Sequence, residues 1–148
     1  MSENKPIKQA YLLLRQNNTE ASLAIISIVL YIFFSILWGI LSDSTWDDDC
    51  VVRYYNVKNA ISDPSMFINL WNQPLFTLLF FLPAQLGKNS IMMLMILINA
   101  ITSWYLFRAC KKTGLKNAWL IIHLFLFQAF YFSVSREALT EPLAACLI

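Results

Sequence analysis

Three consecutive aspartates, Asp47, Asp48 and Asp49, come soon after a long uncharged apolar run that ends at residue 42. Three adjacent carboxylates cannot all ionise cheaply in a low dielectric, so we expect one to stay protonated, to pair with Arg53 or to bind a divalent cation. A carboxylate whose pKa is raised in this way can act as a general base, and Mg²⁺ and Mn²⁺ prefer carboxylate oxygens. The triplet therefore predicts an acid–base or cation site. The alternative is a solvated acidic loop that caps a helix.

A second group of charged side chains stands near the C-terminal end and comprises Arg136, Glu137 and Glu141. The planar guanidinium group of Arg136 suits the oxygens of a phosphate, so it could bind the phosphate of a lipid-linked substrate. It could equally pair with Glu137 or Glu141 and anchor the end of a helix. Both interpretations stay open at the level of the sequence.

The composition is that of an integral membrane protein. Hydrophobic residues make up 58% of the 148 residues and charged residues only 14%, whereas soluble domains have about 25% charged residues. The net charge of +2 and the lack of a basic patch with interleaved aromatic residues argue against a nucleic-acid partner.

Three apolar runs are long enough, at about 17 residues or more, to cross a bilayer as helices: 21–41, 90–107 and 118–134. A fourth is expected from about residue 139, and because the chain stops inside it we expect the front part of a longer protein. The run 75–86 is shorter, and runs of about 10–14 residues are more often re-entrant or interfacial than spanning. The expected fold class is all-α, a polytopic transmembrane protein.

Positive charges in short loops favour the cytoplasmic side of a membrane. Here they concentrate in the N-terminal tail and in the 108–117 loop, as Lys5, Lys8, Arg15, Arg108, Lys111, Lys112 and Lys116. Both segments are therefore expected inside the cell, which leaves 90–107 as the single crossing between residue 43 and the basic loop. Residues 43–89 then form one non-cytoplasmic loop, and residues 135–141 return to the same side. The aspartate triplet and the pair Glu137 and Glu141 would thus share one face of the cell membrane.

Within the external loop, an apolar stripe at helical spacing is formed by Cys50, Tyr54, Val57 and Ile61. An amphipathic helix that bears aromatic residues suits the plane of the membrane interface. We therefore expect this loop to carry amphipathic helices that lie parallel to the membrane.

Taken together, these segments resemble the GT-C superfamily of glycosyltransferases, polytopic enzymes that take a sugar from a polyprenyl-phosphate or dolichyl-phosphate carrier on the non-cytoplasmic side. The resemblance covers most of residues 20–148 and rests on the order of four segments. They are WDDDCVVRYY at 46–55, WNQPLF at 71–76, LGKNS at 86–90 and SREALTEP at 135–142. The last of these is similar to the second external loop of mannosyltransferase-like members.

The resemblance implies an inverting transfer of a hexose or pentose from a lipid-phosphate donor to a glycan, lipid or protein acceptor, among membrane lipids. In the family, one aspartate of the first loop is the base that activates the acceptor hydroxyl. That role falls here on Asp48 or a neighbour, with Asp47 and Asp49 in support or in contact with a divalent cation, Mg²⁺ or Mn²⁺. The substrate-binding residues that the resemblance implies are Arg53, Lys88, Arg136, Glu137 and Glu141.

Two other classes of protein stay open. A transporter or channel would need charges inside the spans or broken helices in paired repeats, and the predicted spans contain no Asp, Glu, Lys or Arg. A non-catalytic membrane subunit would tolerate substitution of the aspartates.

Overall fold

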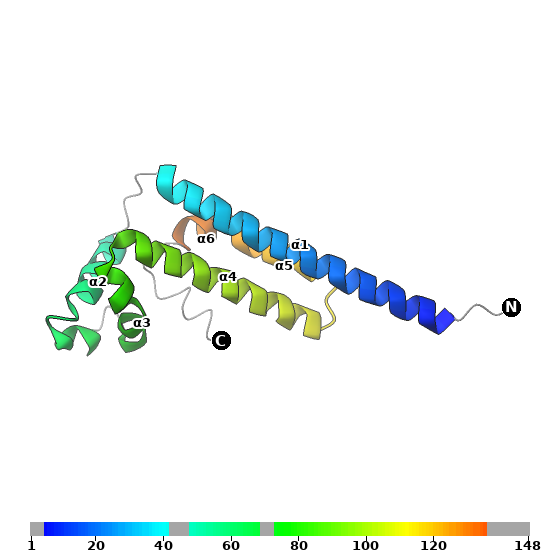
Figure 1. The fold of residues 1–148 in the computed structure, drawn as a ribbon, viewed down its shortest axis with the longest axis horizontal. Coiled ribbons are helices and arrows are strands. Elements are labelled where there is room, and N and C mark those ends of the chain that lie inside the picture. The colour runs from blue at the N-terminus through cyan, green and yellow to red at the C-terminus, as the bar shows by residue number, and fades with distance from the viewer. Residues whose placement is uncertain (1–4, 42–47, 69–72, 136–148) are drawn as a thin grey trace.

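The computed structural model describes residues 5–41, 48–68 and 73–135, and these are almost entirely helical (Figure 1). No β-strand occurs within those ranges, so the expectation of an all-α protein is confirmed. In chain order the elements are α1 (Lys5–Leu41), α2 (Asp48–Asn59), the 3₁₀ helix η1 (Pro64–Ile68), α3 (Pro74–Gln85), α4 (Lys88–Lys112), α5 (Ala118–Phe127) and α6 (Ala129–Val134).

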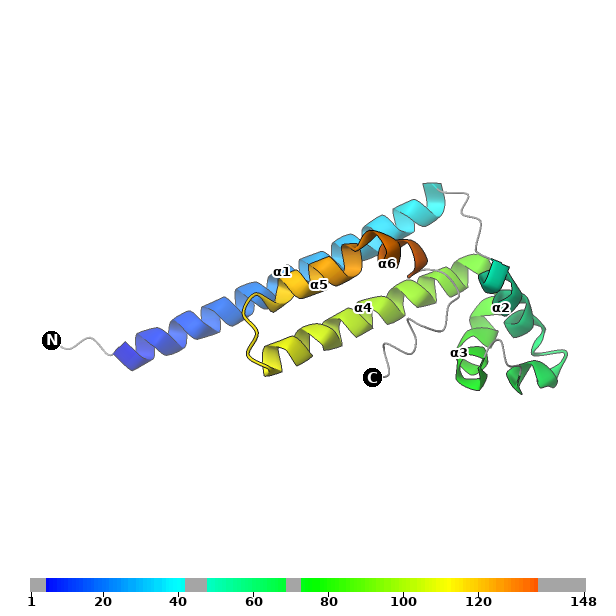
Figure 2. The same ribbon diagram turned by 180° about the vertical axis from the view of Figure 1, so that it is seen from behind.

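Three helices, α1, α4 and α5, pack side by side as an elongated bundle (Figures 1 and 2). The end of α1, the start of α4 and the short helices α2, α3 and α6 all lie at one end of this bundle, which we call the loop end. The turn at residues 113–117 lies at the opposite end, called the turn end. Segments that are far apart in sequence therefore meet at the loop end.

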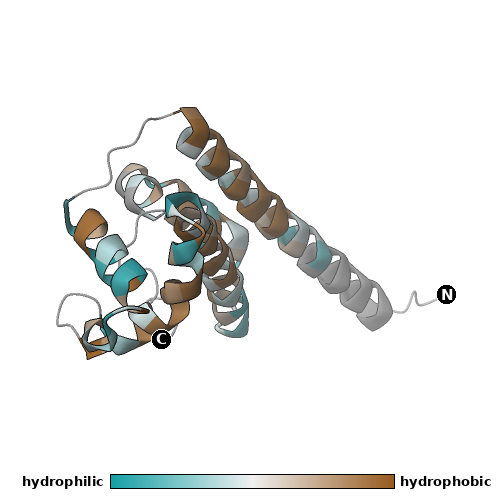
Figure 3. Cartoon of the chain, turned by 60° about the vertical axis from the view of Figure 1, so that its left-hand side comes forward, coloured by the Kyte–Doolittle hydropathy of each residue, from teal (hydrophilic) through white to brown (hydrophobic). Residues whose placement is uncertain are grey.

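The large apolar residues of α1 mostly face away from the bundle. Its buried positions recur every three to four residues as Glu20, Ala24, Ser27, Tyr31 and Ser35. This stripe is small or polar in character, whereas Ile40, for example, is 73% exposed, and Figure 3 shows hydrophobic residues all along the half of α1 that leads into α2. The pattern reverses that of a surface helix in a water-soluble protein. It suits a helix surrounded by lipid, whose contacts with other helices use small and polar residues.

Among the described residues, two helical segments are long and apolar enough to cross a membrane. They are Asn18–Leu41, with 24 residues, and α4, with 25 residues, and about 20 residues are needed. At 1.5 Å per residue the whole of α1 is about 55 Å long, which exceeds a hydrocarbon core of about 30 Å. These segments contain the predicted spans 21–41 and 90–107.

The run 75–86 forms α3, which is too short to cross a bilayer as a straight helix. One of its faces packs on α2 and α4 and buries Phe76, Thr77, Phe80 and Ala84. Its other face exposes four leucines, Leu75, Leu78, Leu79 and Leu82. A short helix with an exposed leucine face suits the predicted interfacial or re-entrant position.

The predicted third span, 118–134, consists of two helices rather than one. Gln128 lies between α5 and α6 in an extended conformation, with ψ of 125°. Its side-chain oxygen accepts a hydrogen bond from the backbone N–H of Tyr131 at 2.7 Å. The amide therefore caps α6 and competes with a continuous helical backbone. The predicted fourth span, from about residue 139, lies outside the described residues.

Candidate functional site

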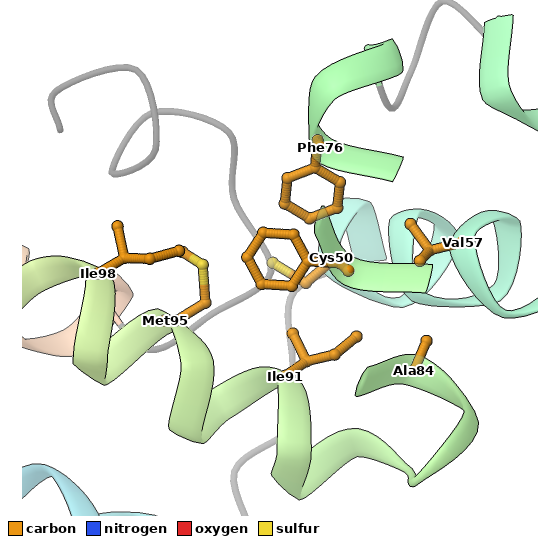
Figure 4. Close-up of a cluster of buried hydrophobic side chains, with 8 residues drawn as sticks. Cys50, Val57, Phe76, Ala84, Ile91, Met95 and Ile98 are labelled. Atoms are coloured by element: carbon orange, nitrogen blue, oxygen red, sulfur yellow. The ribbon is translucent and has the colours of Figure 1, made fainter. Parts of the chain in front are cut away.

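Asp48 and Asp49 lie in the first turn of α2, and both side chains are exposed. The next residue, Cys50, is fully buried in a hydrophobic cluster that contains Phe76 of α3 and Met95 of α4 (Figure 4). Burial of Cys50 anchors the start of α2 and so presents the two carboxylates at the surface of the loop end. Carboxylates are also favourable in the first turn of a helix because of its dipole.

Three of the four residues in the predicted apolar stripe share one face of α2, and the membrane-parallel orientation of this helix stays a prediction. Cys50 and Val57 are fully buried, and Tyr54 packs against the same cluster. The expectation for Ile61 is wrong, because its side chain is 58% exposed. The reason is that α2 ends at Asn59, so helical spacing no longer decides which side of the chain Ile61 occupies.

Two further predicted site residues, Arg53 and Lys88, also belong to elements of the loop end. Arg53 is partly buried and stands four residues after Asp49, a spacing that puts both on one face of α2. Lys88 is exposed in the first turn of α4. It follows Gly87, whose φ of 106° favours glycine over any residue with a side chain. The remaining predicted residues, Asp47, Arg136, Glu137 and Glu141, lie outside the described residues.

A buried polar network that the sequence pattern did not reveal holds Ser135 in place. Asn99 of α4 is fully buried, and its side-chain amide donates hydrogen bonds to the carbonyl oxygens of Ser135 at 2.6 Å and Met95 at 2.8 Å. Tyr131 donates its hydroxyl to the side-chain oxygen of Asn99. The hydroxyls of Tyr31 and Ser135 are hydrogen-bonded at 2.8 Å. The available signal was Asn99 itself, the one carboxamide residue within the predicted span 90–107.

Cys50 and Ser135, which adjoin the two charged segments of the predicted site, are anchored at neighbouring points on α4. Ser135, which opens the SREALTEP segment, is hydrogen-bonded to Asn99. Cys50, which follows the aspartate triplet, shares its hydrophobic cluster with Met95 and Ile98. Positions 95 and 99 are four residues apart, or about 6 Å along a helix. The fold therefore attaches residue 50 and residue 135 to the same turn of α4, although 85 positions separate them in the sequence.

Within the described ranges, no three or more Cys, His, Asp or Glu side chains gather as a set of metal ligands. Asp63 has a structural role, since its carboxylate accepts hydrogen bonds from the backbone N–H of Ser65 at 3.0 Å and from its hydroxyl at 2.7 Å. Asp49 is exposed, and Asp47 lies outside the described residues. Binding of Mg²⁺ or Mn²⁺ by Asp47 and Asp49 therefore stays a prediction.

At the turn end, one buried carboxylate joins three helices. Glu20 of α1 is only 4% exposed and forms an ion pair with Lys111 of α4 at 3.0 Å. The backbone N–H groups of Asn117 and Ala118, at the start of α5, also hydrogen-bond to it. Glu20 therefore has a structural role, since it satisfies the first N–H groups of α5 and neutralises one charge of the basic segment 108–117. The prediction of a loop at 108–112 is wrong, because α4 continues to Lys112 and leaves only 113–117 as the turn.

No protein-family model matches this chain, and no curated protein or solved structure does either. A functional assignment therefore has to come from the residues and from their arrangement. Two features of that arrangement bear on function: the exposed Asp48 and Asp49 at the anchored start of α2, and the backbone of Ser135, which is fixed to the same turn of α4.

Proposed function

We propose that this chain forms the acceptor-activating part of a membrane glycosyltransferase of GT-C type. Such an enzyme transfers a sugar from a lipid-phosphate donor to an acceptor hydroxyl with inversion at the anomeric carbon. The observation that carries the proposal is the convergence of two segments on one turn of α4. The start of α2, with its aspartates, and Ser135, which opens the SREALTEP segment, are both anchored there.

The distribution of charge along the bundle supports a membrane-embedded site with a defined orientation. Arg108, Lys112 and Lys116 stand at the turn end, whereas Asp48 and Asp49 stand at the loop end. Basic residues favour the cytoplasmic side, so the loop end would face the non-cytoplasmic side, where lipid-phosphate sugar donors are used by the family that the sequence resembles. The N-terminus would then be cytoplasmic, and the outward-facing apolar residues of α1 would contact lipid.

The proposed chemistry is a single displacement. An aspartate carboxylate, Asp48 in our assignment, takes the proton of the acceptor hydroxyl, and the acceptor oxygen forms a bond to the anomeric carbon from the face opposite the phosphate. The bond between the anomeric carbon and the phosphate oxygen breaks, and its electron pair leaves with the phosphate. Cationic side chains stabilise that leaving group because negative charge develops on it. Arg53, Lys88 and Arg136 are the candidates for this role.

The test compares sugar transfer by the full-length gene product with transfer by Asp47→Asn, Asp48→Asn and Asp49→Asn. The glycan product is measured by mass spectrometry in cells, and insertion is checked by membrane expression. Removal of the base is expected to reduce product about 10²- to 10⁴-fold in one variant.

Asp63→Asn is a matched control for these variants. Asp63 belongs to the same predicted external loop, but its carboxylate oxygen only accepts hydrogen bonds from Ser65, and the amide oxygen of asparagine can replace that oxygen. This variant should retain full activity. Wild-type product from all three triplet variants would eliminate the proposed base.

A non-catalytic membrane subunit is the second candidate, and the exposure of Asp48 and Asp49 favours it. Exposed carboxylates in the first turn of a helix stabilise that helix without any chemistry. In that case each of the three Asp→Asn variants would insert normally and would support wild-type product.

A further inference from the structure

A groove of about 490 Å³ runs between α1 and α4, and the described residues that line it belong to these two helices. Its walls are apolar and include Ile25 and Val29 from α1 and Ala100 and Ile101 from α4. Its volume falls within the range of about 300–1,000 Å³ that is usual for ligand pockets. The groove belongs to neither the aspartate segment nor the Ser135 network.

One end of this groove carries a positive charge. Arg108 lines the groove at the turn end, and its side chain is exposed. In the part of the chain that the structure describes, no ion pair involves Arg108. The buried acid at the turn end, Glu20, is paired with Lys111 instead. A guanidinium group at the mouth of an apolar groove is complementary to a ligand with an anionic head and an apolar tail.

The length of the groove matches one leaflet of a bilayer. Ala100 and Arg108 are eight residues apart on α4, which corresponds to about 12 Å along a helix. Half of a hydrocarbon core is about 15 Å thick. Trp104 and Tyr105 line the groove close to Arg108, and such aromatic residues prefer the depth of the lipid headgroups.

We propose that this groove binds one acyl chain of an anionic phospholipid from the leaflet at the turn end, with the phosphate group on Arg108. The proposal depends on membrane insertion with α1 and α4 as spans but not on any transferase activity. A membrane helix is a poorer occupant, because helices approach each other closely over small residues and, of the groove residues named here, only Ala100 is small. Exposed Lys112 and Lys116 at the same end add to the attraction for anionic lipid.

The test measures lipid binding to the full chain purified in detergent, by native mass spectrometry. The probes are phosphatidylglycerol and phosphatidylcholine with identical acyl chains, and inorganic phosphate serves as a competitor. Wild-type protein is expected to bind one phosphatidylglycerol about tenfold more tightly than phosphatidylcholine, the difference that one charge-assisted contact provides.

Three variants separate the two halves of the proposed site. Arg108→Gln should remove the preference for the anionic lipid, and Ala100→Phe should weaken the binding of both lipids by filling the groove. Lys116→Gln, which removes a charge outside the groove, is the matched control and should keep at least half of the preference. If Ala100→Phe disturbs the packing of α1 on α4, Ile101→Trp fills the groove from a wall residue that is 42% exposed.

Each outcome bears on the proposal directly. Retention of the lipid preference by Arg108→Gln, or unchanged affinity after the groove is filled, would overturn it. Displacement of the lipid by inorganic phosphate alone would also overturn it, because the site would then recognise a free anion rather than a lipid. Loss of the preference for phosphatidylglycerol in Arg108→Gln, with unchanged sugar transfer by the same variant, would support the lipid site independently of the proposed transferase.

Discussion

Replacement of Asn99 by leucine should destabilise the protein by about 2–3 kcal/mol. Asn99 is fully buried, and leucine has the same number and branching of side-chain heavy atoms but offers no hydrogen bond. The change leaves the Ser135 carbonyl oxygen and the Tyr131 hydroxyl without their partner on α4. An orphaned buried polar group costs about 1–3 kcal/mol, and a partly exposed one costs less because water can reach it. Loss of the hydrogen bond from Asn99 to the Met95 carbonyl adds little to this cost, since a carbonyl within a helix keeps its backbone hydrogen bond.

The assay is reversible unfolding of the full chain in mixed micelles, followed by tryptophan fluorescence as the denaturing detergent is titrated. Thr102→Val is the matched control. Thr102 is also buried on α4, one turn from Asn99, but its hydroxyl donates only to the Ile98 carbonyl within the same helix at 2.8 Å. We expect its loss to cost less than about 1 kcal/mol, since intrahelical back-bonding contributes little.

A double-mutant cycle tests the hydrogen bond directly. Tyr131→Phe removes the hydroxyl that donates to Asn99. If the bond forms, the effects of Asn99→Leu and Tyr131→Phe should be non-additive by about 0.5–1.5 kcal/mol. Equal losses of stability in Asn99→Leu and Thr102→Val, together with additive effects in the cycle, would show that the Asn99 side chain forms no stabilising hydrogen bond between α4 and the α5–α6 segment. The α5–α6 segment would then be held by packing alone.

Two further predictions concern the ends of the bundle. Gly87→Ala should lower the free energy of unfolding by about 1–2 kcal/mol, because φ of 106° is strained for any residue with a Cβ atom; a wild-type thermal midpoint would contradict this. Lys111→Met should cost about 1–3 kcal/mol, because it leaves the buried Glu20 carboxylate without its cation. Lys112 is exposed and serves as the control, so Lys112→Met should change the free energy of unfolding by less than about 0.5 kcal/mol. Equal effects of the two lysine variants in the denaturing-detergent titration would argue against a buried ion pair.

Sequence patterns alone predicted the helical class and the positions of the two long apolar helices among the described residues. Uncharged runs of about 20 residues have few other solutions, because a helix satisfies all of its backbone hydrogen bonds within one segment. Local patterns also predicted that 75–86 forms a shorter element and that Cys50 and Val57 share one face of a helix, because both signals depend only on local length and spacing. At Ile61 the same reasoning failed where α2 had already ended.

Which residues meet depends instead on how the helices pack together. The contact between Asn99 and Ser135 depends on the packing of α1, α4 and α5, and no local spacing encodes a pair that is 36 positions apart. The same holds for Glu20, whose position just before an apolar run gave no indication that it would be buried against Lys111 and the start of α5. The break at Gln128 also came from a choice between two hydrogen-bonding schemes, a continuous helical backbone or the side-chain cap on Tyr131 that the structure shows. Such choices are settled by the surrounding helices, because the local sequence is compatible with either one.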